Sequence, residues 1–313
     1  MSASMPHSRS RHHAHLAVAV ARRYHLAGES KSDIARSLQI SRFKVARLLE
    51  DAHAMGLVTI EVRDPDGDDP LGVAVARKFG LDECVVVRGI GDRDAAALVG
   101  AAAARVVERT VTADDVLGLP WSRAVHAAIG ALTHLPAIDI VQLCGSLVTP
   151  GQETAYDIVR EAGRMTYGHT LWYHAPLIMP TAEGASSLKA HGDIARARAA
   201  VDQVTVALCS IGAWEPDGST VHDAFSLDEA RAARERGVVG ESMGLLFDEH
   251  GQTTDSPLAQ RIITLTPDQL CRIPTVIGMA RGVNRAAATR AALRGRWIRR
   301  LVVDDALAEA LLT

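Results

Sequence analysis

Cysteine and aromatic residues are scarce in this chain of 313 residues, which contains four cysteines and only 4% Phe, Trp and Tyr. The cysteines lie far apart and include no Cys-x-x-Cys pair, so the sequence predicts neither a disulfide framework nor a zinc site. Most of them stand in apolar, strand-like runs, where cysteine behaves as a small hydrophobic residue. We therefore expect no metal and no cofactor, and a reducing cytoplasm as the compartment.

Long apolar runs are missing as well. No stretch approaches the roughly 20 apolar residues that a membrane-spanning helix needs, so we expect no membrane partner. The basic start of the chain lacks a long apolar core with a cleavage site, which excludes a secretory signal. We interpret residues 1–13 as a disordered arm. His12, His13 and His15 fit a polar tail better than a metal site.

Charge is divided unevenly along the chain. The whole sequence has a formal net charge of −3, but residues 1–63 carry +5 and the remainder therefore carries −8. A basic head on an acidic body is typical of a protein of which only the head approaches a phosphate backbone.

Two short amphipathic segments within residues 28–55 predict a helix-turn-helix. Ile34 and Leu38 mark one face of a first helix, and Ser41 stands where the N-cap of a second helix is expected. A tight turn leaves the second helix free to lie in the major groove of double-stranded DNA, where Arg can contact guanine. The residues that we expect to contact DNA are Lys31, Ser32, Ser41, Arg42, Phe43, Lys44 and Arg47.

An ordinary helical hairpin with a solvated basic face has the same local pattern. The uneven charge favours DNA binding over this alternative.

The order of segments predicts two domains. A helix from about Ala14 to Ala27 and a strand over Leu57–Arg63 complete a DNA-binding domain at 14–63, and the DPDGDDP segment at 64–70 is a linker. Residues 71–313 alternate strands with helices, which indicates an α/β fold with a mostly parallel sheet covered on both faces. The expected strands are 83–87, 115–119, 138–144, 170–173, 204–211, 275–280 and 301–303, and the expected helices are 95–111, 122–132, 153–165, 193–202, 284–293 and 305–312.

Open parallel sheets bind ligands at the carboxyl ends of their strands. Trp121, Ser122 and Arg123 follow one expected strand and begin a helix, whose N-terminal N–H groups favour an anion. Gly145 and Gly212 follow two further strands, and glycine lets a ligand approach the backbone closely. Tight strand-to-helix turns explain any single glycine better than a ligand does, but three such ends together modestly favour a pocket.

Several longer motifs follow one another along the chain. They are GLVTIEVRDP, LGLPWSRAV, VQLCGS and CSIG, and then the block at 238–282, which contains GESMG, the FD-x-x-G turn and the SPL turn. In this order they resemble the SorC-type (SorC/DeoR) family of sugar-responsive bacterial transcription regulators, and the resemblance covers about residues 16–312.

The resemblance implies a DNA-binding head joined to a Rossmann-like effector domain similar to sugar-phosphate isomerases and deaminases. It also implies a dimeric or tetrameric regulator, such as a repressor of a carbohydrate catabolic operon, whose affinity for operator DNA responds to a sugar, polyol or sugar phosphate. By the same resemblance the effector contacts are Trp121, Ser122, Arg123, Gly145, Gly212, Glu241 and Arg285. Glu241 could accept hydrogen bonds from sugar hydroxyls, and Arg285 could pair with a phosphate or carboxylate.

The chain departs from the family pattern in its first loop. Pro120, Ser122 and Ala124 stand where relatives commonly have a small residue, a glycine and a hydroxyl residue. Cys144 stands where phosphate-responsive relatives often have a polar or basic side chain, which weakens the case for a phosphorylated effector.

Two other classes of function compete with regulation. A sugar-phosphate isomerase or deaminase with an accessory head is compatible with the fold, but no carboxylate–His pair forms a recognisable catalytic set, so we expect no enzyme. A sugar sensor that acts through protein contacts alone conflicts with the basic second helix.

Overall fold

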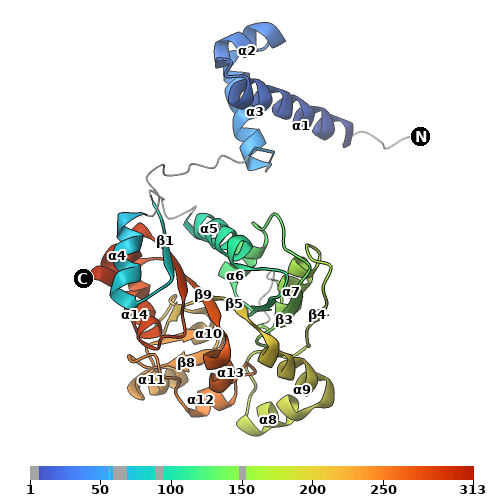
Figure 1. The fold of residues 1–313 in the computed structure, drawn as a ribbon. Coiled ribbons are helices and arrows are strands. Elements are labelled where there is room, and N and C mark those ends of the chain that lie inside the picture. The colour runs from blue at the N-terminus through green and yellow to red at the C-terminus, as the bar shows by residue number, and fades with distance from the viewer. Residues whose placement is uncertain (1–6, 56, 59–68, 89–94, 148–152) are drawn as a thin grey trace. The chain divides into compact units, whose positions relative to one another are not determined.

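The computed structural model describes residues 7–55, 57–58, 69–88, 95–147 and 153–313. It divides into two compact units, Met1–Pro65 and Asp66–Thr313, which we call the head and the body (Figure 1).

The head is a small helical unit. Its described elements are α1 (His7–Ala21), a short π-helix (Arg22–Leu26), α2 (Lys31–Leu38) and α3 (Arg42–Ala54). Val20, Ile34, Val45 and Leu48 are buried together between the helices. Because these few aliphatic side chains are the centre of the head's core, each contributes a large share of its stability.

Serine caps define the two helices of the helix-turn-helix. Ser30 Oγ accepts a hydrogen bond from the Asp33 N–H at 3.2 Å, and Ser41 Oγ accepts one from the Lys44 N–H at 3.1 Å. Gln39 ends α2 in the left-handed region at φ +53°. The chain therefore turns sharply between α2 and α3, as the sequence predicts.

The expected disordered arm is wrong from His7 onward, because α1 begins at that residue. Residues 7–13 contain no proline or glycine that would stop the helix. His13 Nε2 also lies 2.8 Å from Asp51 Oδ2 of α3, which ties the helix to the head. The expected strand at Leu57–Arg63 lies mostly outside the described residues, and Leu57 and Val58 are not part of a strand.

The body is built on a seven-stranded parallel sheet. Its strands, in spatial order, are β1 (Glu83–Val87), β10 (Arg300–Asp304), β9 (Thr275–Ala280), β5 (Val206–Ser210), β2 (Val116–Leu119), β3 (Asp139–Gln142) and β4 (Thr170–Leu171). Aliphatic residues dominate these strands because both faces are covered. The parallel sheet confirms the predicted fold class.

Helices cover the two faces of the sheet (Figure 1). The helices α5 (Ala95–Thr110), α6 (Arg123–Ile129) and α7 (Ala155–Gly163) pack on one face, and α4 (Pro70–Phe79), α14 (Ala286–Arg294) and α15 (Asp305–Leu312) pack on the other. Side chains alternate between these two cores along each strand. Leu208 belongs to the first core, for example, and its neighbour Cys209 to the second.

The predicted linker at 64–70 is wrong at its last residue, because helix α4 begins there. Pro70 is the first residue of this helix, and the side chain of Asp69 accepts a hydrogen bond from the Leu71 N–H at 2.8 Å. The proline and aspartate that look like helix breakers in the sequence therefore start a helix. Residues 64–68 of the expected linker lie outside the described residues.

The segment between β4 and β9 holds further short elements. Three strands form a small antiparallel sheet, β6 (Gly212–Ala213), β7 (Gly240–Ser242) and β8 (Leu245–Phe247). The accompanying helices are α8 (Ala182–Ala190), α9 (Gly192–Ala199), α10 (Thr220–Asp223), α11 (Leu227–Glu235), α12 (Pro257–Gln260), α13 (Pro267–Arg272) and the 3-10 turn at Ala200–Gln203; a second 3-10 turn, Val283–Arg285, follows β9. The small sheet continues directly from the end of β5.

The strand order reverses between β2 and β5. From β2 the chain proceeds outward through β3 to β4, and from β5 it proceeds the opposite way through β9 to β10. Connections therefore leave β2 and β5 in opposite directions, which opens a crevice at their carboxyl ends. Among the described residues, no helix has the length and apolar character needed to cross a bilayer.

Candidate functional site

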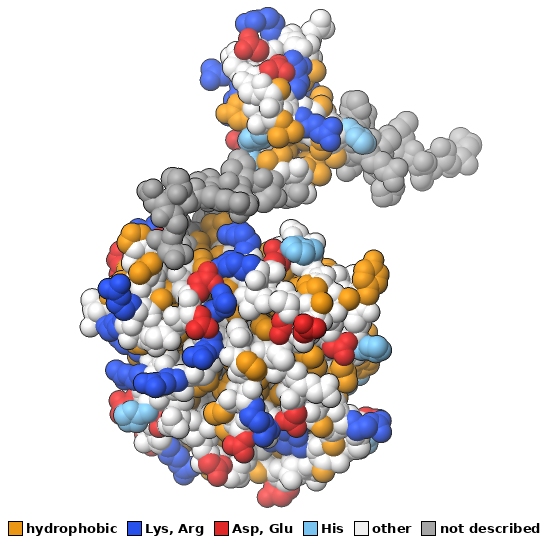
Figure 2. Space-filling view, viewed as in Figure 1, with side chains coloured by type: hydrophobic (Ala, Val, Ile, Leu, Met, Phe, Trp, Pro, Cys, Tyr) orange, Lys and Arg blue, Asp and Glu red, His pale blue; other side chains and the backbone are white. Residues whose placement is uncertain are grey.

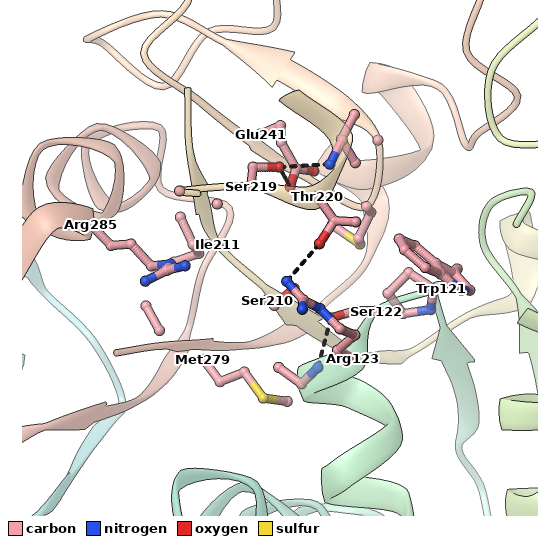
Figure 3. A pocket seen from close by; sticks show the side chains of 18 of the residues that line it. Trp121, Ser122, Arg123, Ser210, Ile211, Ser219, Thr220, Glu241, Met279 and Arg285 are labelled. Carbon is pink, nitrogen blue, oxygen red and sulfur yellow. Dashed lines mark hydrogen bonds between the residues drawn. The ribbon is translucent and has the colours of Figure 1, made fainter. Parts of the chain in front are cut away.

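A cavity of about 270 Å³ lies at the crevice between β2 and β5 (Figure 3). Residues that follow β2, β5 and β9 line it, and the small antiparallel sheet closes one side. Six of the seven residues that we expected to contact an effector line this cavity, namely Trp121, Ser122, Arg123, Gly212, Glu241 and Arg285. They come from segments far apart in the chain that the sheet topology brings together.

Gly145 is the expected contact that does not line the cavity. A Cβ atom at this position would lie 2.5 Å from the carbonyl oxygen of Pro176, and the Gly145 N–H donates to the Ile263 carbonyl at 2.9 Å. The glycine therefore allows close packing of backbone segments rather than access for a ligand.

Glu241 is a buried carboxyl group in the wall of the cavity. It lies in β7, where it pairs with Gly212 of β6, and Ser219 Oγ donates a hydrogen bond to its Oε1 at 2.7 Å. Burial raises the pKa of Glu241 above its ordinary value, while the hydrogen bonds from Ser219 and the Gly244 N–H and the charge of Arg285 oppose that rise. The carboxyl group can accept hydrogen bonds from a polar ligand.

Gly212 makes room for this carboxyl group. A Cβ atom at position 212 would lie 2.5 Å from Glu241 Oε1 and 2.7 Å from the Ser219 Cβ. No side chain fits there without moving the Glu241–Ser219 pair. The sequence suggests a glycine that lets a ligand approach, whereas the structure shows one that lets a carboxylate approach.

Three arginines line the same cavity. Arg285 lies across the cavity from Trp121 in Figure 3, and its Nη1 donates to the Arg281 carbonyl at 3.0 Å. Burial lowers the pKa of Arg285, and the nearby charges of Arg281 and Arg123 lower it further, while Glu215 and Asp304 oppose the shift. An anionic group bound among these guanidinium groups would relieve their mutual repulsion.

Hydroxyl groups connect the ends of β2 and β5. Ser122 Oγ lies 2.8 Å from Ser210 Oγ, and either atom can be the donor. Ser122 Oγ also accepts from the N–H groups of Ala124 at 3.2 Å and Val125 at 3.4 Å. The expectation of free N–H groups at the start of α6 is therefore wrong for these two residues, because the serine side chain already caps them.

Arg123 and Thr220 meet across the cavity. Arg123 Nη2 donates to Thr220 Oγ1 at 3.0 Å, which joins the start of α6 to α10 (Figure 3). Trp121 is anchored on the other side, where its Nε1 donates to the Glu153 carbonyl at 2.8 Å. The polar atom of the indole is thus occupied, and its ring supplies apolar surface.

Sequence reasoning missed Ser219, Thr220 and Arg281 as lining residues, and it did not select Ser210 as a ligand contact. Arg281 and Ser210 stand at the carboxyl ends of β9 and β5, so the rule that placed the other contacts could have found them. Ser219 and Thr220 form the start of the short helix α10, and the sequence around them carries no recognisable motif.

The exposed surface of α2 and α3 is the second candidate site. This surface includes six exposed residues and the half-buried Lys31; the exposed ones are Ser32, Ser41, Arg42, Phe43, Lys44 and Arg47. Among the described residues, Arg42, Lys44 and Arg47 form no ion pair. Lys and Arg side chains are spread over the visible face of the head in Figure 2. The helix therefore offers uncompensated positive charge to a phosphate backbone.

Within the part of the chain that the structure describes, no group of three or more His, Cys, Asp or Glu side chains could hold a metal ion. Six histidines of the described part each lie within 4.0 Å of a carboxylate instead, namely His13, His126, His134, His169, His222 and His250.

Comparison with known proteins gives consistent results. The family model for the sugar-binding domain matches residues 64–313. The sorbitol operon regulator of Klebsiella pneumoniae is 26% identical over 310 residues, which cover 95% of this chain and 97% of that protein. The transcriptional regulator LsrR of Escherichia coli is 26% identical over 295 residues, 92% of each chain. The crystal structure of the full-length SorC regulator of K. pneumoniae superposes with a TM-score of 0.77 at 24% identity and covers 96% of this chain and 98% of that one.

Proposed function

This chain belongs to the SorC-type family of sugar-binding transcriptional regulators. On this basis we propose a separate function for each of its two units. The head reads double-stranded operator DNA through α3, and the cavity of the body binds a sugar-type effector that changes the affinity for the operator. The observation that carries this proposal is the assembly of Trp121, Ser122, Arg123, Glu241 and Arg285 around one cavity at the reversal of strand order.

The effector class that fits the cavity best is a small phosphorylated sugar or polyol. Hydroxyl groups and the Glu241 carboxyl group suit the hydroxyls of a sugar, and three arginines suit an anionic group. Arg281 adds a further cation to the cavity. It lies outside the first loop, so the departures from the family pattern in that loop do not remove it. The volume of about 270 Å³ lies at the small end of ligand pockets, which favours a single sugar unit.

An enzyme is the competing function, and the cavity gives it little support. Among the described residues that line it, Glu241 is the only carboxylate and there is no histidine, so no acid–base pair is present. The relatives are named as transcriptional regulators. We therefore place this chain among cytoplasmic, DNA-binding regulators without catalytic activity of their own.

A homo-oligomer completes the proposal. Two heads in a dimer would contact half-sites about one helical turn, or a multiple of it, apart on the operator. An effector that binds one arrangement of subunits more tightly than another shifts the population toward that arrangement.

Fluorescence anisotropy with DNA from upstream of the gene tests the proposal. We expect salt-sensitive binding of the full chain to a specific duplex, and a change in apparent affinity with a sugar phosphate that the unphosphorylated sugar does not produce. Absence of specific binding under all these conditions would reject the function.

Two variants test the cavity itself. Glu241→Gln and Arg285→Gln should bind DNA normally and lose the response to the effector. Arg236→Gln, which changes an exposed arginine at the end of α11, is the matched control and should respond normally. A normal response in both cavity variants would place the effector elsewhere.

A further inference from the structure

Phe43 is exposed to solvent at the start of the recognition helix. It is the second residue of α3, and its relative exposure is 79%. The helix buries Val45, Leu48 and Leu49 against the rest of the head, so Phe43 contributes nothing to that core. A phenyl ring left in water is unfavourable for a small unit unless a partner covers it.

Cations share the face of α3 that carries this ring. Phe43, Lys44 and Arg47 line one shallow groove of the head, together with Asp51 and Met55 further along the helix. Arg42 precedes the ring and is also exposed. Asp51 pairs with His13, and the described residues leave Arg42, Lys44 and Arg47 without ion pairs, so the ring lies among unpaired cations.

A polyanionic partner fits such a surface, and a second copy of the chain does not. A second copy packed on the same face would bring Arg42, Lys44 and Arg47 against their own counterparts, and the like charges would repel. Double-stranded DNA supplies negative charge along both sides of its grooves. The occupant of this face is therefore a duplex.

The chemistry of the Phe43 side chain limits which groups of a DNA duplex it can recognise. Its side chain has no hydrogen-bond donor or acceptor. In the major groove, the edge of each base pair presents donors and acceptors, and the one apolar group is the C5 methyl of thymine. We propose that Phe43 packs against a thymine methyl group and thereby specifies thymine at one position of each half-site; this rests on the proposed function of the head.

Removal of a single methyl group provides a direct test. The full chain is first used to select its preferred duplex from a random pool, and each thymine of that duplex is then replaced in turn by deoxyuridine. Deoxyuridine keeps every hydrogen-bonding group of thymine and lacks only the methyl group. We expect about four-fold weaker binding at one position of each half-site, the loss typical of one methyl group removed from apolar contact, and no change elsewhere.

Variants at positions 42 and 43 assign the effect to the ring. Phe43→Ala should weaken binding to the thymine duplex and bind thymine and deoxyuridine duplexes equally, and Phe43→Leu should keep part of the discrimination. Arg42→Ala is the control, which should bind more weakly overall and keep the four-fold ratio. Because Phe43 is exposed, we expect the melting temperature of each variant to match that of the natural chain.

The outcomes separate this inference from the proposed function. Selection of a specific duplex with no methyl-sensitive thymine would overturn the role of Phe43 and leave operator binding intact. The role of Phe43 is equally overturned if Phe43→Ala keeps the four-fold ratio, or if it changes the oligomeric state in sedimentation instead of the ratio. Failure to select any preferred duplex would reject both proposals.

Discussion

Glu241 combines a position in the cavity wall with a cost in stability. Its carboxyl group is buried, and burial raises its pKa. A carboxyl group with a raised pKa in the folded state contributes stability that is fully present below its unfolded pKa, about 4.3. That contribution is lost as the pH rises through the folded value, where the buried charge must form.

We therefore expect the free energy of unfolding of Glu241→Gln at pH 7 to equal or exceed that of the natural chain. Near pH 4 we expect this advantage of the variant to be smaller or absent. Glutamine keeps an oxygen that can accept from Ser219 and removes the buried charge. Urea unfolding across pH 4–7 measures the difference (the range follows from the reference pKa of about 4.3). Glu235→Gln, at the exposed end of α11, is the control and should follow the natural chain throughout. A constant difference across the range would contradict the assignment of the charge to position 241.

Gly212 offers a second test at the scale of a single residue. In Gly212→Ala the new methyl group would meet Glu241 Oε1 at 2.5 Å, so the Ser219–Glu241 hydrogen bond must break or shift. We expect a loss of about 1–3 kcal/mol in the free energy of unfolding and weaker effector binding, measured by urea unfolding and calorimetry. Gly192→Ala is the matched control, because a Cβ atom at that position meets nothing within 4 Å. Equal behaviour of the two variants would show that the space at Gly212 is not needed.

At the scale of elements, the N-terminal cap of α3 is the feature with the clearest consequence. Ser41 Oγ accepts from the Lys44 N–H at 3.1 Å and fixes the start of α3. Ser41→Ala should cost about 1 kcal/mol of stability in the head and weaken DNA binding. Hydrogen exchange measured by mass spectrometry should show faster exchange in peptides of α3 only.

Ser186→Ala, at an exposed position within α8, is the control for this change and should leave exchange in the head unaltered. Unchanged exchange in α3 of the Ser41 variant would show that the hydrogen bond of the cap is not needed to hold the start of the helix.

Elements with a strong local pattern were predictable from the sequence, and elements without one were not, even where they are as long as α8 and α11. The bounds expected for β1, β9 and α15 agree with the structure, because buried aliphatic runs and an amphipathic helix carry strong local signals. The strands β6 to β8 have only two or three residues each, so pairing across the sheet rather than local pattern determines them. Helix α4 was missed because Pro70 has opposite meanings inside a helix and at its first turn.

The candidate site was predictable to a similar degree. The contacts at strand ends, such as Arg123, follow from the general position of ligands on parallel sheets. Ser219 reaches the cavity only because its loop folds back over β6, and no local pattern shows this. Gly145 does not line the cavity, and the sequence could not show this, because a glycine indicates close approach without revealing whether a ligand or the chain itself approaches.

At the scale of the whole molecule, we expect the two units to unfold in separate transitions on heating. A ligand that binds only the folded body should raise the melting temperature of the body by mass action and leave that of the head unchanged. Differential scanning calorimetry of the full chain should show two transitions. A sugar phosphate at about 100 times its Kd should stabilise the unit behind one of them by roughly 2.7 kcal/mol. One transition that shifts as a whole would show that the units unfold cooperatively.

The order of segments along the chain has a consequence during protein synthesis. The head ends at Pro65, whereas the cavity needs Arg285, close to the carboxyl terminus. A ribosome therefore completes the head long before the last residues that line the cavity emerge. A nonsense mutation between these two points leaves α3 complete and removes Arg285 from the cavity, so a truncated chain of this kind should show no response to the effector.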